Sequence, residues 1–537
     1  MNASRPLTRV VVLGRDADLW LCVNALSRAL GPAGVAVVAI ELPTRLKPSH
    51  VSATLPPLEA LHAKLEIKES ALIRATGGSF SFGQNIVAAA GPGSNFFHAW
   101  GAYGAQIDGS AFFPCWLKAT RHGLNIPLQN FSPTAVAALN GRMLLPDATT
   151  AAFGRADYGY HLQTLAYVGF LKSVCARLGA EICEAQAVAV ERDEVTGFIT
   201  ALIVDGSLRL EGHLFVDATG EDAVLIGESL GVPCEYWHQY FGVDRVHIAR
   251  APAFTSTPPF AEIRIGRAGW TALHPNQLAT GISHAFSSHL SSDEAAVESA
   301  QAASGTKLAD VYFHRVNPYI RARVWEGNCV AVGGSACVLD PIHDVELHAL
   351  QLGLVHLLSL FPVTGQFAVE RAEYNRLMRS NYERVRDFQC AFYALSPSLD
   401  GEFWQQMRSP RWGRHRSPLG TSPRPAGDVT AAAAPVPRLQ CRGSSQMVPS
   451  ALEHKVATFR ARAVIAPLED ETFFPESWQA LFIGLGVVPE SWPPTVDKIA
   501  PRRLQEELRR MLEFIKGKVR EQPSHSGYLE SLCRSSA

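Results

Sequence analysis

Residues 8–41 read TRVVVLGRDADLWLCVNALSRALGPAGVAVVAIE, and this stretch decides the fold. An apolar run ends at Gly14, and a second apolar run, 35–41, ends at Glu41. Between them, apolar residues recur at helical spacing: Leu19, Val23, Leu26 and Leu30. This pattern predicts a strand, a helix and a second strand of a buried parallel sheet. In such sheets a ligand lies near the carboxyl end of the first strand, and an acidic residue closes the second.

Further segments of the same kind lie far along the chain. Strand-like runs occur at 187–193, 197–206 and 214–222, and the last of these contains Asp217. A third strand-and-turn segment, NCVAVGGSACVLDP, covers 328–341. Helical patterns span 160–178 and 346–361, and the second stops at Pro362. Three strand-turn-helix pieces this far apart predict one discontinuous α/β domain.

The C-terminal third changes in composition. Residues 409–446 are rich in Pro, Arg, Ser, Gly and Ala without periodicity, so we expect a disordered insert. An out-of-frame stretch of coding sequence would give a similar composition. Helical patterns resume at Val448, and 504–521 is expected to form a surface helix with charged i,i+4 pairs. The predicted organisation is therefore 1–400, an insert at 409–446, and a helical region at 447–537.

Composition excludes several functions. The chain has 49 Lys plus Arg against 50 Asp plus Glu and no long basic run, which argues against nucleic acid or an anionic membrane as partner. No apolar stretch is long enough for a membrane span, and the N-terminus runs directly into a strand pattern, so we expect a cytoplasmic protein. The ten cysteines form no C-x-x-C pair, and we expect no metal site.

A collinear set of segments resembles the flavin-dependent tryptophan halogenases over roughly residues 8–400 and 448–530. These segments are VVVLG at the start, TLPPLEALHAKLEIKESALIRATGGSF (54–80), YGYHLQTLAYVGFLKSVCARLGAEI (158–182), VDATGED (216–222), GNCVAVGGSACVLDP (327–341), SALEHKVATFRAR (450–462) and ETFFPESWQALFIGLG (471–486).

The resemblance implies an FAD-binding Rossmann-like domain of the flavin monooxygenase type, a mixed-sheet substrate region and a mostly helical C-terminal part. In that family reduced FAD, supplied by a flavin reductase, reacts with oxygen and oxidises a halide. The hypohalous acid then passes through a tunnel to a lysine and a glutamate beside an aromatic substrate.

The cofactor motif is reduced in this chain. The family's G-x-G-x-x-G corresponds to residues 14–19, in which only Gly14 remains and Asp16 places a carboxylate where phosphate charges belong. The family's Gly-Glu-Ser-Thr loop corresponds to 51–54, and Ser335 replaces an acidic residue. By resemblance the remaining cofactor positions are Gly14, Glu41, Asp217, Gly333 and Gly334.

The catalytic positions are replaced as well. The lysine position is Ser81, which carries no cation, and the glutamate position is His343, which could still act as a general base near neutral pH. The positions that hold the halide correspond to Val345 and Glu346, and Glu346 should repel chloride. Asp344 and Glu346 also favour the N-terminus of the helix that follows, which gives them a structural reading.

The substrate region keeps some aromatic residues. The family's W-x-W-x-I-P corresponds to WTALHP at 270–275, which retains Trp270 and the proline. Trp100 and Phe97 are further candidates for an aromatic ligand, although such residues are more often part of a core.

Two functions of different classes follow. The first is a halogenase-fold protein without halogenation activity, which acts as a binding or accessory partner, in a homodimer or in a heterodimer with an intact relative. The second is an active FAD-dependent halogenase, or another flavin monooxygenase-type oxidoreductase, that uses an altered turn and His343 as base on an aromatic, tryptophan-like substrate. Flavin binding would discriminate between them.

Overall fold

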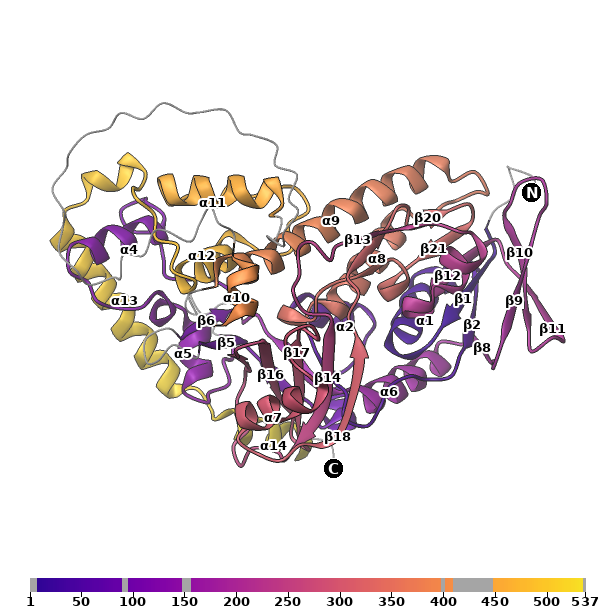
Figure 1. Ribbon diagram of the computed structural model, residues 1–537, viewed down its shortest axis with the longest axis horizontal. Helices are drawn as coiled ribbons and strands as arrows, with labels where there is room; N and C mark the ends of the chain where they lie inside the picture. The colour runs from indigo at the N-terminus through magenta and orange to yellow at the C-terminus, as the bar shows by residue number, and fades with distance from the viewer. Residues whose placement is uncertain (1–6, 89–94, 147–155, 397–400, 409–447, 535–537) are drawn as a thin grey trace.

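The computed structural model describes residues 7–88, 95–146, 156–396, 401–408 and 448–534. Figure 1 shows a parallel sheet on the right, a larger mixed sheet in the centre and the C-terminal helices on the left. The insert expected at 409–446 lies outside the described residues. The fold is the mixed α/β architecture that the sequence predicts.

A six-stranded sheet forms around the N-terminal strand, in the order β20-β21-β12-β1-β2-β8. All neighbours pair in parallel except β20 and β21. Val10 to Leu13 are fully buried, because the strand has apolar side chains on both faces. The predicted strand-helix-strand unit is confirmed. The bounds are β1 Arg9–Gly14, α1 Asp16–Leu30, β2 Ala36–Glu41, β8 Glu181–Glu184, β12 Leu214–Ala218, β20 Trp325–Glu326 and β21 Cys329–Ala331.

The helix predicted for 160–178 begins four residues late. The strand β7 (Gly159–Gln163) comes first, and α6 (Thr164–Arg177) follows. β7 pairs on both sides, with β3 (Val51–Ala53) and β4 (Ser79–Ser81), so tertiary pairing overrides the helical pattern. The Gln163 side chain accepts a hydrogen bond from the Ala166 amide and caps the helix.

A seven-stranded sheet forms the centre of the molecule, in the order β18-β14-β17-β16-β15-β5-β6. Its pairings are antiparallel except that between β15 and β5. Its helix α7 (Asp293–Ser304) contacts β14, β16 and β17. The strands are β5 Gly83–Ala88, β6 Phe96–Ala99, β14 Arg245–Ala251, β15 Ala261–Ile265, β16 Gly269–Pro275, β17 Thr280–Phe286 and β18 Ala309–Arg315.

Two small sheets complete the strands. One contains β9 (Val188–Arg192), β10 (Ile199–Val204) and β11 (Leu208–Glu211), which confirms the strands expected at 187–206. The other contains β13 (Cys234–Tyr236), β19 (Tyr319–Arg321) and β22 (Cys337–Val338).

The remaining helices cover these sheets. α8 ends at Ser359, two residues before the predicted end, and it packs on the long helix α9. The helix bounds are α2 Pro57–Lys64, α3 Glu69–Thr76, α4 Phe112–Arg121, α5 Pro133–Leu139, α8 Glu346–Ser359, α9 Ala368–Leu395, α10 Glu402–Met407, α11 Ser450–Arg462, α12 Pro475–Gly484, α13 Pro501–Glu521 and α14 His525–Arg534.

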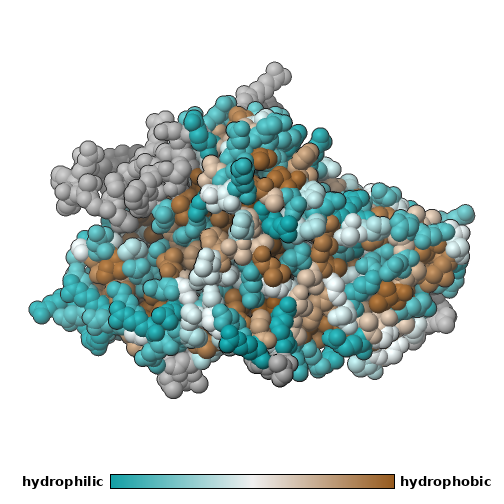
Figure 2. All heavy atoms as spheres, turned by 90° about the horizontal axis from the view of Figure 1, so that it is seen from below, coloured by the Kyte–Doolittle hydropathy of each residue, from teal (hydrophilic) through white to brown (hydrophobic). Residues whose placement is uncertain are grey.

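The C-terminal helices share the hydrophobic core of the rest of the chain. α12 packs on β6, α13 on α4 and α5, and α14 on α3. α13 buries Leu504, Leu508, Leu512, Ile515 and Val519 along one stripe and exposes charged residues on the other face, which is the pattern of a surface helix. Figure 2 shows hydrophilic residues over most of one face of the molecule, with hydrophobic residues between them.

Within the described ranges, no helix is both long and apolar enough to span a membrane. The nine cysteines that the structure describes are free thiols. Cellular location and the three-part division of the chain stay predictions.

Candidate functional site

The predicted cofactor residues converge at the carboxyl edge of the parallel sheet. The register pairs Gly14 with Glu41 on one side and with Ala218 on the other. Asp217 pairs with Ala331, and Gly333 and Gly334 follow that strand after one intervening residue, Val332. The fold therefore brings together residues that are up to 320 positions apart, as the sequence predicts for a parallel sheet.

Gly14 is needed for close strand packing. A Cβ atom at this position would lie 2.5 Å from the Ala218 carbonyl oxygen, which belongs to the backbone of β12 and cannot move aside. The Arg15 amide donates a hydrogen bond to the same oxygen. The glycine is thus required by the sheet itself, whether or not a ligand binds.

The carboxylate of Glu41 has two partners from the protein. Lys172 Nζ lies 2.5 Å from Glu41 Oε2, and Trp20 Nε1 donates to Glu41 Oε1 at 3.2 Å. Lys172 also lies above the Trp20 ring, 5.4 Å from its centre. The acidic residue that closes β2 is therefore tied to α1 and α6.

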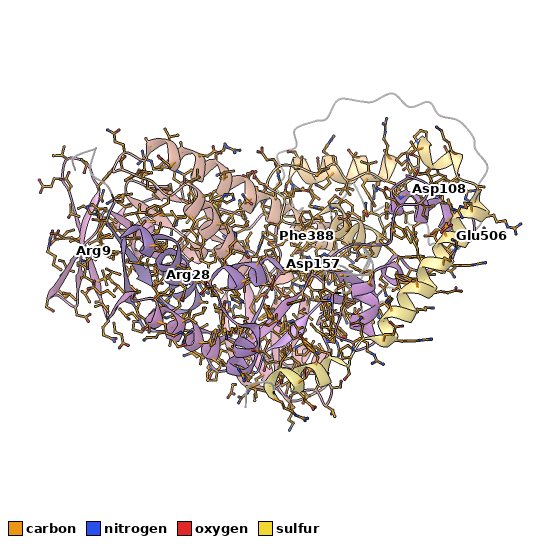
Figure 3. All side chains as sticks on the ribbon, turned by 180° about the vertical axis from the view of Figure 1, so that it is seen from behind. Arg9, Arg28, Asp108, Asp157, Phe388 and Glu506 are labelled. Atoms are coloured by element: carbon orange, nitrogen blue, oxygen red, sulfur yellow. The ribbon has the colours of Figure 1, made fainter. Side chains whose placement is uncertain are left out.

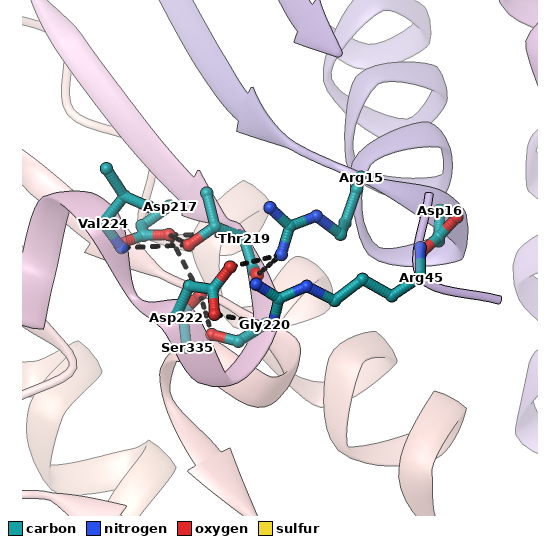
Figure 4. A network of polar contacts seen from close by, with 9 residues as sticks. All are labelled: Arg15, Asp16, Arg45, Asp217, Thr219, Gly220, Asp222, Val224 and Ser335. Atoms are coloured by element: carbon teal, nitrogen blue, oxygen red, sulfur yellow. Dashed lines mark hydrogen bonds and ion pairs between the residues drawn. The ribbon is translucent and has the colours of Figure 1, made fainter. Parts of the chain in front are cut away.

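Asp217 is fully buried, and protein donors surround both of its oxygens. The backbone amides of Leu225 and Ile226 each donate to Oδ2 at 2.8 Å. Thr219 donates to Oδ1 through its amide and its hydroxyl, and Ser335 Oγ lies 2.9 Å from the same atom. Figure 4 shows part of this network. Asp217 holds together the turns that follow β12 and β21.

An ion-pair cluster formed by Arg15, Arg45 and Asp222 lies at the turn after β1. The Arg15 guanidinium lies 2.5 Å from Asp222 Oδ2, and the Arg45 guanidinium lies 2.7 Å from Asp222 Oδ1 (Figure 4). Asp16 adopts a left-handed conformation with φ of 55°, and Thr44 donates a hydrogen bond to its carboxylate. Both cations near the turn therefore share the single carboxylate of Asp222 as their ion-pair partner.

Further carboxylates lie around the same edge. Burial, together with the charge of Glu346, raises the pKa of Asp18 to about 7. Glu346 is open to solvent, yet desolvation by the surrounding protein and the charge of Asp16 raise its pKa. The Gly334 amide donates to Asp18 Oδ2, and a Cβ at Gly333 would meet that atom at 2.2 Å. The edge is electronegative.

The FAD that the resemblance implies would bring a pyrophosphate to this edge. Unit charges of like sign about 4 Å apart repel by around 4 kcal/mol at an effective dielectric near 20. Here the nearby guanidinium groups are already paired with Asp222, and Asp16, Glu346 and the ionised form of Asp18 have the sign of the phosphates. The residues present do not fit a bound pyrophosphate.

At the family's catalytic positions, Ser81 is a buried residue at the end of β4. It is 3% exposed, and its hydroxyl donates to the Gly83 carbonyl oxygen at 3.3 Å. No cation replaces the family's lysine at this position. Ser81 thus stabilises the turn from β4 to β5.

His343 lies in the interior, between the central sheet and α9. Its Nδ1 is 2.8 Å from Gln84 Oε1, and its Nε2 has no hydrogen-bond partner among the described residues. Its ring lies 5.1 Å from the ring of Phe388 and 5.5 Å from that of Phe392. Figure 3 shows Phe388 in the middle of the molecule. Burial lowers the pKa of His343 to about 3, so the ring is neutral near pH 7.

Through Gln84 and Asp344, His343 is connected to a second histidine, His274. Gln84 Nε2 donates to Asp344 Oδ2 at 2.8 Å, and His274 Nε2 lies 2.9 Å from Asp344 Oδ1. Although burial acts to raise the pKa of Asp344, the neighbouring His274 lowers it below its ordinary value. Asp344 is therefore ionised near neutral pH.

The sequence analysis missed Gln84 and His98. His98 on β6 is fully buried, both of its ring nitrogens lack a described partner, and its ring lies 6.0 Å from His343. The signal available was a polar residue inside an apolar strand: Gln84 in GQNIV and His98 in FFHAW.

Of the aromatic candidates, Trp100 lies at this cluster. Its ring is 4.8 Å from His98, and its indole N–H has no described partner. Phe97 is buried against Phe260, with ring centres 5.6 Å apart. Trp270 is buried and donates to the Tyr393 hydroxyl at 2.9 Å. These two side chains pack within the protein core.

The halide positions diverge. Val345 is 2% exposed and precedes the first residue of α8, whereas Glu346 begins that helix and is open to solvent. Glu346 interacts with Asp16 and Asp18 at the sheet edge. Among the described residues, no group of three or more His, Cys, Asp or Glu side chains could hold a metal ion.

Known proteins resemble this chain in sequence over most of its length. The family model for tryptophan halogenase matches residues 9–416 and 439–501. Tryptophan 7-halogenase KtzQ of Kutzneria sp. (strain 744) is 26% identical over 420 residues, covering 74% of this chain and 78% of that protein. Tryptophan 6-halogenase SttH of Streptomyces toxytricini is 22% identical over 76% of this chain and 82% of that protein.

Solved structures are similar over almost the whole chain. BrvH, a flavin-dependent halogenase from Brevundimonas sp. BAL3, aligns with a TM-score of 0.86 and 28% identity, covering 98% of this chain and 99% of that one. Xcc4156, a flavin-dependent halogenase from Xanthomonas campestris, aligns with a TM-score of 0.86 and 27% identity over 99% and 100% of the two chains. With its fold, its sheet-edge residues and a family model that matches most of its length, this chain belongs to the tryptophan halogenase family.

Proposed function

We propose that this protein is a tryptophan halogenase-like protein without halogenation activity, which acts as a binding or accessory partner. The observation that carries the proposal is the carboxyl edge of the parallel sheet. There, Arg15 and Arg45 both pair with Asp222, and the Glu41 carboxylate is bound by Lys172. The charged side chains that could bind a nucleotide form ion pairs with one another instead, which favours a structural role for this edge.

The replaced catalytic positions support the same proposal. Ser81 has no amine to bind or activate a halogen, and its hydroxyl is bound to the Gly83 carbonyl. Glu346 repels an anion at the position where relatives hold the halide, and Val345 is buried. Loss of one general acid/base or electrostatic group costs about a hundredfold or more in rate, so several losses together leave no useful turnover.

The cellular role that fits this proposal is a cytoplasmic partner subunit. The protein would form a homodimer, or a heterodimer with an intact halogenase relative, and would need no metal. Its ligand would be an aromatic small molecule bound near Trp100 and His343. A flavin reductase would be a partner only if the protein is active.

A second function has its own supporting observation. Within the described ranges, His343 Nε2 has no hydrogen-bond partner and lies among aromatic rings, so it could act on an aromatic substrate as a base. In that case the protein is an active FAD-dependent halogenase, or another flavin monooxygenase-type oxidoreductase, and Arg15 or Arg45 must leave Asp222 to receive the cofactor.

Flavin titration of the purified full-length protein tests the proposal. We expect a colourless protein, no heat of binding with oxidised FAD or with anaerobically reduced FAD, and an unchanged melting temperature. A yellow protein with flavin absorbance would contradict the proposal and favour the second function.

A matched pair of variants adds a positive control. Asp222→Asn frees both guanidinium groups from their ion pairs and should raise the affinity for FAD above that of the wild type. Asp205→Asn, at an exposed turn that follows β10, should leave it unchanged. If the two variants bind flavin equally, the ion pairs are not what excludes the cofactor.

A further inference from the structure

Four polar side chains form one continuous chain of hydrogen bonds in the interior. His274 on β16 bonds to Asp344, Asp344 to Gln84 on β5, and Gln84 to His343. The distances are 2.9, 2.8 and 2.8 Å. These residues come from three separate parts of the fold, and the chain ends at the Nε2 atom of His343, which has no hydrogen-bond partner in the part of the protein that the structure describes.

The chemistry of Asp344 sets the direction of this chain. An ionised carboxylate only accepts hydrogen bonds, so the Gln84 atom that faces it must be the amide nitrogen. The carbonyl oxygen of Gln84 then faces His343 and can only accept. Therefore His343 Nδ1 must carry a proton. Burial favours the neutral ring, and in a neutral ring that is protonated at Nδ1 the Nε2 atom is unprotonated. The assignment of the proton to Nδ1 follows from donor and acceptor rules, and it does not depend on which amide atom is drawn as oxygen.

The backbone holds His343 and Asp344 in place for these bonds. Both residues have left-handed conformations, with φ of 70° and 57°. This conformation is unfavourable for residues other than glycine, so the bonds to Gln84 and His274 help to hold the turn. Two successive strained residues turn both side chains toward Gln84.

We propose that Gln84 is a positioning residue that holds His343 in the Nδ1–H tautomer. The Nε2 atom then faces the surrounding phenylalanine rings as a neutral hydrogen-bond acceptor. In the family that this chain resembles, the position of His343 carries an anionic glutamate. In this chain a neutral imidazole nitrogen at that position accepts the hydrogen bond from an N–H or O–H donor.

The surroundings of Nε2 fit an acceptor that is kept ready for a donor. Phe388, Phe392 and Phe473 contribute rings without competing polar atoms, with centres 5.1 to 6.4 Å from the His343 ring. A buried polar atom without a partner is unfavourable, so the fold bears this cost at Nε2. The His98 ring lies 6.0 Å from the His343 ring, and neither of its nitrogens has a partner among the described residues.

The experiment measures the tautomer directly in the wild-type full-length protein. Histidine labelled with ¹⁵N reports, through two-bond ¹H–¹⁵N correlations, which ring nitrogen carries the proton. His343→Phe assigns the signal by its loss. We expect His343 to be protonated at Nδ1 alone from pH 8 down to pH 5. Protonation at Nε2, or an imidazolium at pH 6, would overturn the proposal.

Variants test whether Gln84 is the cause. Gln84→Met removes the acceptor and should shift the ratio of the two tautomers by about tenfold toward Nε2–H. Asp344→Asn can present either an amide or an oxygen to Gln84, so the fixed direction is lost and both tautomers should appear. Asn tolerates the left-handed conformation, so this variant keeps the turn. An unchanged tautomer in both variants would overturn the role of Gln84.

Gln351→Met is the matched control. Gln351 is 7% exposed and donates to the Pro57 carbonyl, so its loss disturbs packing without touching His343. It should leave the tautomer unchanged. The wild-type measurement decides the proposal even if a variant fails to fold. Since flavin is absent from every sample, the result is also separate from the outcome of the flavin titration.

Discussion

The edge of the parallel sheet and the interior around His343 both differ from the motifs of the tryptophan halogenase family, but in different ways. At the sheet edge, the charged groups are paired with each other: Arg15 and Arg45 with Asp222, and Lys172 with Glu41. Around His343, buried polar atoms such as His343 Nε2 and both ring nitrogens of His98 have no partner among the residues that the structure describes.

This difference separates structural from functional roles. At the sheet edge, Asp222 pairs with both Arg15 and Arg45, and Lys172 pairs with Glu41, so these groups have partners within the protein. An unpaired buried nitrogen has a cost, and such costs persist mainly where a ligand or a reaction uses them. We infer that the sheet edge now serves the fold, and that any remaining chemistry lies around His343. The predictions below test both halves, from the largest effect to the smallest.

Asp217→Ala should give the largest loss of stability. Five hydrogen-bond donors around the carboxylate would lose their acceptor in the interior, at about 4 kcal/mol in the free energy of unfolding. The measurement is urea unfolding followed by circular dichroism. Asp205→Ala, which removes an exposed carboxylate that accepts from two backbone amides, should cost about 1 kcal/mol. Equal losses would mean that the edge is not held by Asp217.

Ser81→Lys should destabilise the protein by about 3 kcal/mol relative to Ser81→Met, because an ammonium group would enter a buried strand without a partner. The methionine variant has a similar length, so the difference isolates the charge. The lysine variant should also show no halogenation of tryptophan with reduced FAD, halide and oxygen. Turnover by this single variant would contradict the assignment of the sheet edge to the fold.

Much of the fold could be predicted from the sequence, because its signal is local. The apolar run before Gly14 and the helical spacing after it were enough for the first strand-helix-strand unit. The start of α6 could not be predicted in the same way. Residues 159–163 form a strand because β3 and β4 pair with them from distant positions, and no local pattern contains that information.

The candidate site was predictable only where it followed the resemblance. His343 was found by its position after Asp340 and Pro341, and it lies in the interior; its role stays a proposal. Gln84 escaped notice because its importance depends on Asp344, which is 260 residues away. The sequence shows the replaced groups, but only the structure shows which of them gained new partners.

Stability at alkaline pH should rise in Asp18→Asn. Burial and Glu346 raise the folded pKa of Asp18 to about 7, above its unfolded value near 4, so the native state favours the protonated form. Ionisation therefore removes stability as the pH rises from about 4 to 7. Because water screens the half-buried side chain, we expect a gain of about 2 kcal/mol at pH 8 and none at pH 4.

Urea unfolding at both pH values measures this effect. Asp16→Asn neutralises a neighbouring carboxylate that Thr44 binds, and it serves as the control with a smaller gain. If Asp18→Asn is equally stabilising at pH 4 and pH 8, its effect comes from packing, and the electronegative character assigned to the sheet edge is wrong.

Arg15→Gln and Arg45→Gln should give the smallest and most instructive difference. Both guanidinium groups pair with Asp222, but the Arg15 side chain is 13% exposed and that of Arg45 is 65% exposed. Because solvent screens the exposed pair, Arg45→Gln should cost less than about 1 kcal/mol, and Arg15→Gln about 1–2 kcal/mol. Urea unfolding at low and high salt separates them, since salt should abolish the Arg45 effect and leave most of that of Arg15. If high salt abolishes the stability loss of both variants, the ion-pair cluster of Arg15, Arg45 and Asp222 is a surface feature, and the turn remains open to an anionic ligand.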